Sequence, residues 1–226
     1  ALYELSLHDH ILELQRAQSP YAFHSLGSCI SIQRKVYEQV RGFPKRAGGE
    51  DFYLLNKAAK LSEFQEASSG TLILEGRVSN RVPFGTGPAL AKLSQQESMV
   101  DSPLFYHRSS YAALSAFLAV MRDAVSNKQA LATALVGQED VYITLENMGV
   151  EKASTHCRGH SSDPAGFMRH FHQWFDGFRT LKFLHALREQ GRTDQSFKEL
   201  YGESDPVPVL VESRRLLGWD RLGTDP

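Results

Sequence analysis

A short loop leads through two adjacent glycines, Gly48 and Gly49, directly into two adjacent carboxylates, Glu50 and Asp51. An apolar run with helical periodicity follows at once, so the loop is expected to end at a helix N-terminus. There, backbone N–H groups and the helix dipole favour the ionised form of Asp51. An ionised carboxylate on a glycine-rich loop suits a general base that acts on an acceptor hydroxyl. Carboxylates are also common at helix starts, so simple capping is the alternative role for this pair.

The stretches on either side of this loop occur in a characteristic order. Upstream lie an extended run beginning at His24, one or two helical turns and a Gly42-Phe43 turn; downstream lie Arg77, Arg81 and a Gly-Thr-Gly turn. This order resembles the second half of a family 2 glycosyltransferase with the GT-A fold. The resemblance covers residues 21–90, well under half of the chain, and its most specific part is the acidic pair after Gly-Phe.

The resemblance implies a fold, a donor and a mechanism. Asp51 would take the proton of an acceptor hydroxyl during transfer from a nucleotide sugar, and Glu50 would orient the acceptor or share that role. Mg²⁺ or Mn²⁺ would be held mainly by a preceding half with an Asp-x-Asp motif, which this chain lacks. We therefore expect a C-terminal fragment that is inactive alone. The chain departs from the family at Arg41, where a first glycine is common, and in its basic Lys45-Arg46 segment.

Further candidate substrate-binding residues lie on both sides of the acidic loop. Arg77 and Arg81 are separated by an even number of positions, so an extended backbone places both guanidinium groups on one face. They could clamp phosphate or pair with nearby carboxylates. Gly27 and Ser28 permit close backbone approach to a ligand. His24 could contact the substrate, or it could be a structural histidine.

The overall pattern predicts an α+β chain that is mostly helical. The expected parts are a GT-A-like portion over residues 1–95, with a small mixed sheet from Gly27–Ile32 and Leu72–Val78, and a helical region over 96–226. Tyr3–Gln15 is predicted to form an amphipathic helix. One long helix is predicted over 164–189 because aromatic residues recur there at spacings of four and three.

Composition limits the classes of function. The formal net charge is −1 and the pI is about 6.8, which argues against a nucleic-acid-binding surface along the whole chain. No apolar run is long enough to span a bilayer. The first ten residues lack the pattern of a secretion signal, and the two cysteines do not indicate a disulfide framework. We expect a cytoplasmic protein.

Two other interpretations of the C-terminal region remain open. One is a zinc site among clustered histidines and a cysteine, which are His156, Cys157, His160, His170 and His172. Gly159 and the following serines argue against a continuous helix there, and a packed or solvated surface is the favoured alternative. The other interpretation is a non-catalytic helical interaction module over 103–217. Its aromatic helix could bind a partner or form a homo-oligomer.

Overall fold

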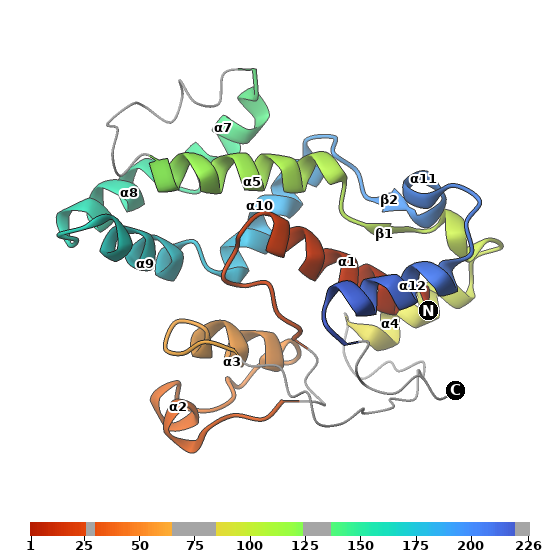
Figure 1. The fold of residues 1–226 in the computed structure, drawn as a ribbon, viewed down its shortest axis with the longest axis horizontal. Coiled ribbons are helices and arrows are strands. Elements are labelled where there is room, and N and C mark those ends of the chain that lie inside the picture. The colour runs from red at the N-terminus through yellow and green to blue at the C-terminus, as the bar shows by residue number, and fades with distance from the viewer. Residues whose placement is uncertain (26–29, 65–84, 124–136, 220–226) are drawn as a thin grey trace. The chain divides into compact units, whose positions relative to one another are not determined.

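The computed structural model describes residues 1–25, 30–64, 85–123 and 137–219. Within these ranges the chain is α+β and mostly helical, as the sequence predicts (Figure 1). The helices are α1 Leu2–Arg16, α2 Arg34–Gln39, α3 Glu50–Ala58, α4 Thr86–Ser94, α5 Arg108–Asp123, α7 Glu139–Asn147, α8 Val150–Gly159, α9 Pro164–Trp174, α10 Gly177–Glu189, α11 Phe197–Tyr201 and α12 Pro206–Leu216, with a 3-10 turn at Met99–Asp101.

The sheet differs from the prediction. Within the described residues it has two antiparallel strands, β1 Pro103–Phe105 and β2 Gln195–Ser196. Ile30–Ile32 has no strand structure, and the remainder of the first predicted strand and all of the second lie outside the described residues. The mixed sheet expected from those two segments therefore stays a prediction, and the sheet that the described residues form is a short antiparallel ribbon made of other segments.

The chain forms two compact units. The first contains residues 1–12, 22–105 and 195–226, and the second contains residues 13–21 and 106–194. These units are defined by spatial contacts. The predicted division into a GT-A-like portion over 1–95 and a helical region over 96–226 stays a prediction.

The first unit has two apolar clusters. Leu5, Phe105, Phe197 and Leu210 bring together α1, β1, α11 and α12. A second cluster consists of Val40, Leu54 and Ala58, with Leu54 fully buried. This second cluster fixes α3 against the end of α2, because both helices bury their apolar stripes in it. It thereby positions the loop that carries the acidic pair.

The core of the second unit is aromatic. Phe117 of α5 contacts the rings of Phe171, Phe175 and Phe183, with centroid separations of 5.8, 5.1 and 6.1 Å. All four side chains are at most 1% exposed. Phe171 of the predicted aromatic spacing thus lies in a packed core, whereas Trp174 and Phe178 of the same spacing are only half-buried.

The single long helix predicted over 164–189 is wrong. It is two helices, α9 and α10, that are separated at Phe175 and Asp176. The Asp176 carboxylate accepts a hydrogen bond from the backbone N–H of Arg179 at 3.0 Å, which caps the start of α10. An aspartate followed by Gly177 therefore starts a new helix within an uninterrupted aromatic pattern.

Candidate functional site

The acidic pair lies where the sequence predicts, at the N-terminus of a helix. Helix α3 begins at Glu50, and Gly49 precedes it with a left-handed φ of 69°. Glu50 and Asp51 are both half-buried in the first helical turn. Glycine adopts this backbone conformation without the steric cost that a Cβ would add. The second glycine of the loop is thus the residue that turns the chain into α3.

The Asp51 carboxylate is held by a hydrogen bond from the next residue in the chain. Its Oδ1 accepts the backbone N–H of Phe52 at 2.7 Å. The residue at the N-cap position is Gly49, which has no side chain, so neither carboxylate is the N-cap. Among the described residues, neither Glu50 nor Asp51 takes part in an ion pair, and Asp51 Oδ2 has no hydrogen bond. Within the described part of the chain, one oxygen is therefore held and the other has no partner.

The loop before the acidic pair is shaped by aromatic contacts. The Arg46 guanidinium lies 3.8 Å from the centre of the Tyr53 ring, which ties the loop to α3. The rings of Tyr37 and Phe43 meet edge to face at 6.1 Å. Both rings are partly exposed, at 37% and 45%. The segment that precedes the acidic pair in the sequence thus presents two partly exposed aromatic rings, one from α2 and one from the loop.

Two successive residues at the end of α2 have left-handed backbone conformations. Arg41 has a φ of 62° and Gly42 a φ of 65°. Positive φ is uncommon for a residue with a long side chain. Arg41 therefore occupies a position whose backbone favours glycine, and it is the position where the glycosyltransferase resemblance has its first departure.

Four of the remaining candidate substrate-binding residues lie outside the part of the chain that the structure describes. Arg77 and Arg81 fall in 65–84, and Gly27 and Ser28 fall in 26–29, all outside the described residues. The predicted phosphate clamp and the predicted close backbone approach stay predictions.

His24 is described, and its ring contacts are with other aromatic side chains of the first unit. Its ring lies 5.5 Å from that of His8 and 4.8 Å from that of Trp219. Burial, together with the nearby His8 and His10 and against the opposing effect of Glu4, lowers the pKa of His24 to about 4. These contacts favour the structural role among the two that the sequence left open.

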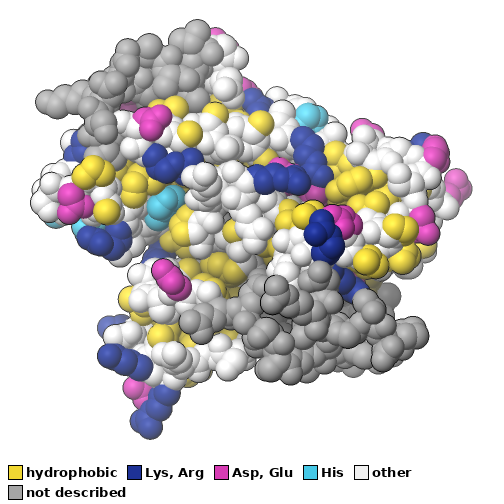
Figure 2. All heavy atoms as spheres, viewed as in Figure 1, with side chains coloured by type: hydrophobic (Ala, Val, Ile, Leu, Met, Phe, Trp, Pro, Cys, Tyr) yellow, Lys and Arg dark blue, Asp and Glu magenta, His cyan; other side chains and the backbone are white. Residues whose placement is uncertain are grey.

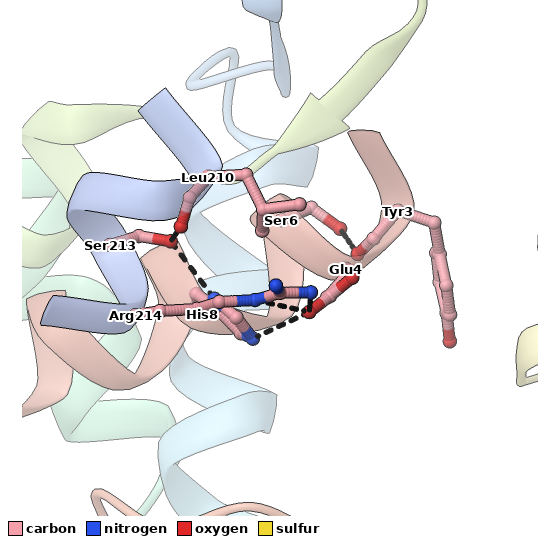
Figure 3. Close-up of polar contacts among 7 residues, drawn as sticks. All are labelled: Tyr3, Glu4, Ser6, His8, Leu210, Ser213 and Arg214. Atoms are coloured by element: carbon pink, nitrogen blue, oxygen red, sulfur yellow. Dashed lines mark hydrogen bonds and ion pairs between the residues drawn. The ribbon is translucent and has the colours of Figure 1, made fainter. Parts of the chain in front are cut away.

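His8 forms a polar network between α1 and α12 (Figure 3). Its Nδ1 lies 2.9 Å from Ser213 Oγ, and its Nε2 lies 3.6 Å from Glu4 Oε1. Arg214 donates two hydrogen bonds to the same Glu4 oxygen, at 3.1 and 2.6 Å. Burial lowers the pKa of His8 to about 4, with Glu4 opposing and Arg214 assisting. His8 is therefore neutral at physiological pH.

A serine, a histidine and a glutamate in line resemble a nucleophile with its base, but the protons are arranged differently here. Ser213 Oγ donates its single proton to the Leu210 carbonyl at 2.7 Å. His8 Nδ1 must then donate to Ser213, whereas a general base would accept from it. Ser213 and His8 are 4% and 2% exposed. This network is a satisfied buried contact that joins two helices.

No sequence signal points to this network. His8 and Ser213 are separated by about two hundred positions and belong to no spaced motif.

The Mg²⁺ or Mn²⁺ that the glycosyltransferase resemblance implies, held mainly by a preceding half, stays a prediction. No group of three or more His, Cys, Asp or Glu side chains in the described ranges is arranged to hold a metal ion.

Comparisons with protein-family models, with curated proteins and with solved structures found no significant match to this chain. A search of the described helices found none that is both long and apolar enough to cross a membrane.

Proposed function

We propose that this chain is part of a nucleotide-sugar-dependent glycosyltransferase in which Asp51 is the general base. The observation that supports the proposal is the hydrogen bonding of the two Asp51 carboxylate oxygens. One oxygen is held by the N–H of Phe52, and the other has no hydrogen bond within the described residues. A carboxylate oxygen of this kind, in the first turn of α3, is the group that a general base uses.

In the proposed transfer step, one bond forms and one bond breaks at the anomeric carbon of the donor. Asp51 Oδ2 takes the proton of the acceptor hydroxyl as that oxygen forms a bond to the anomeric carbon of the donor. The bond from the anomeric carbon to the nucleoside diphosphate oxygen breaks, and its electron pair leaves with the diphosphate. Attack opposite to the leaving group inverts the configuration. Glu50, in the same helical turn, orients the acceptor or shares the proton.

The surroundings of the loop suit a sugar acceptor. The partly exposed rings of Tyr37 and Phe43 offer faces on which a sugar can stack. Lys45 is exposed in the same loop, and in Figure 2 Lys and Arg side chains gather over the α2 end of the first unit. These cations would attract a phosphate of the donor or an anionic acceptor. Arg77 and Arg81 are the proposed phosphate ligands.

The test compares turnover with stability in the natural protein that carries this sequence. Release of nucleoside diphosphate is measured over a panel of sugar nucleotides, for the wild type and for Asp51→Asn. Asparagine keeps the size and can still accept the Phe52 N–H, but it cannot take a proton. We expect turnover to fall by about 10²–10⁴-fold with the melting temperature and donor affinity little changed.

Glu50→Gln is the companion variant, because adjacent carboxylates can exchange roles. A folded Asp51→Asn protein with wild-type turnover would remove Asp51 from the mechanism. A wild-type protein that releases no nucleoside diphosphate from any donor would overturn the proposed function itself.

A second candidate function is protein interaction through α12. Val207 and Val211 are one helical turn apart and are 54% and 52% exposed, so they form an apolar stripe on that helix. If this stripe binds a second copy or another protein, Val207→Asp with Val211→Asp abolishes the association in sedimentation experiments. If the wild type is monomeric and captures no partner, this candidate is wrong.

A further inference from the structure

Two exposed histidines lie on one face at the C-terminal end of α8. Helix α8 runs over Val150–Gly159 and His160 follows as its C-cap, so the helix ends at the glycine and serines that the sequence indicates as a break. His156 and His160 are one turn apart, and side chains four residues apart on a helix are neighbours. Their ring centroids are 4.2 Å apart with an interplanar angle of 35°.

The tautomer of His160 is fixed by its backbone contact. His160 Nδ1 lies 2.9 Å from the carbonyl oxygen of His156. Because a carbonyl oxygen only accepts, Nδ1 carries the proton and donates it. The lone pair of His160 therefore resides on Nε2. A metal-binding histidine usually donates its second ring N–H to a backbone carbonyl or a carboxylate in this way, which orients the ring and raises its basicity.

His156 is equally available. Its ring forms no hydrogen bond or ion pair among the described residues, and its side chain is exposed. Among the aromatic rings of the described residues, that of His160 is the one that contacts it. Either of its nitrogens can thus present a lone pair to a ligand.

The separation of the two rings matches joint ligation of one ion. Zn–N bonds of about 2.0–2.1 Å at a tetrahedral angle place two imidazole centroids about 5 Å apart, which a small side-chain rotation achieves from the observed arrangement. The site is at the C-terminal end of α8, where unpaired carbonyls and the helix dipole favour a cation.

Two cationic side chains, Arg158 and Lys152, lie near the pair in the sequence. Arg158 lies two residues from each histidine and thus on another helix face, and its NH2 group donates to Ser154 at 2.7 Å. Lys152 is exposed one turn before His156 and is the cation that opposes metal binding on this face. Removing its charge should therefore strengthen binding.

We propose that His156 and His160 form a two-imidazole binding site for a divalent first-row transition-metal ion, with water completing the coordination. Imidazole nitrogen suits Zn²⁺, Ni²⁺ and Cu²⁺, whereas Mg²⁺ and Ca²⁺ require oxygen ligands. The site lies in the second unit and is independent of the proposed transferase chemistry. Bound metal would cross-link the last turn of α8 and hold it closed.

The experiment measures ZnCl₂ binding to the tag-free 226-residue chain by calorimetry, with the Cu²⁺ EPR spectrum as a second readout. We expect one site in the wild type, with Cu²⁺ bound more tightly than Zn²⁺ and with nitrogen hyperfine structure from two imidazoles. His156→Ala and His160→Gln should each weaken Zn²⁺ binding by about tenfold or more.

His170→Ala is the matched control, because it removes a histidine of the same unit outside the pair and should leave the affinity unchanged. Lys152→Ala should bind as tightly as the wild type or more tightly. Absence of Zn²⁺ binding by the folded wild type would overturn the proposal. Wild-type affinity in the His156→Ala, His160→Gln double variant would also overturn it, because the ion would then be held elsewhere.

Discussion

A Cβ atom built on Gly42 would lie 2.9 Å from the hydroxyl oxygen of Tyr37, a separation shorter than any ordinary contact. Gly42 also has a φ of 65°, which adds backbone strain to this overlap for every other residue. Glycine is therefore required where the chain turns from α2 into the loop that carries the acidic pair.

Gly42→Ala should consequently lower the free energy of unfolding by about 1–2 kcal/mol. Urea unfolding followed by circular dichroism measures the change. Tyr37 is partly exposed, so Tyr37→Ser in the same background should relieve the overlap but leave the backbone strain. Full recovery in the double variant would show that backbone strain contributes nothing.

Arg41→Gly should stabilise the protein. Arg41 has a left-handed backbone, and releasing it from this conformation offsets the extra entropy that glycine has in the unfolded chain. We expect a gain of about 0.5–1 kcal/mol in the free energy of unfolding. Arg41→Ala is the control, because alanine keeps the strain and removes only an exposed side chain. Equal effects of the two substitutions would contradict the strain argument.

Acidification should destabilise the fold between about pH 6.5 and about pH 4. The pKa values of His8 and His24 are lowered to about 4 in the folded state, mainly by burial. The unfolded chain, with an ordinary histidine pKa of about 6.5, binds more protons in this window, so stability is complete above it and falls as the pH decreases. The expected loss is on the order of 2 kcal/mol.

Urea unfolding at a series of pH values tests this. Replacing both His8 and His24 with glutamine should flatten much of the dependence. His172, whose pKa burial and the nearby Arg122 also lower to about 4, should retain part of it. An unaltered slope in the double variant would contradict the assignment.

Removing the cap of α10 should lower the stability of the protein, because this cap starts a new helix where the sequence pattern predicts a continuous one. Asp176→Ala loses the hydrogen bond to the Arg179 N–H and should cost about 1–2 kcal/mol, whereas Asp176→Asn should cost little because asparagine caps as well. Thermal unfolding compares the two. Similar losses for both would mean that the charge of Asp176 matters more than its cap.

Truncating the centre of the second unit should have the largest effect. Phe117→Ala removes a fully buried ring that contacts three others, and we expect a loss of about 3–5 kcal/mol. Phe43→Ala, at an exposed ring, should change stability by less than about 1 kcal/mol. A small loss for Phe117→Ala would mean that the remaining rings collapse into the space.

Local sequence signals predicted local structure well. Tyr3–Gln15 is predicted to be helical, and α1 confirms this within a few residues. The acidic pair also lies at a helix start, because glycines followed by an apolar periodic run specify that geometry within one short segment.

Features that depend on distant residues could not be predicted. Pairing of β1 with β2 joins segments of two and three residues that are about ninety positions apart, and neither segment is long enough to show periodicity. The contact of His8 with Ser213 likewise depends on tertiary packing alone. The α9–α10 break was missed because the aromatic spacing continues across it, while a single aspartate decides where the backbone turns.

The first unit is assembled from three separate stretches of chain, and this has a consequence for the order of folding. The apolar cluster with Leu5 includes Leu210, so it cannot be completed until nearly the whole chain has left the ribosome. The second unit is drawn mainly from the continuous stretch 106–194 and can form earlier during synthesis. Closing a loop of about two hundred residues is slow, so the first unit should be the late step in refolding.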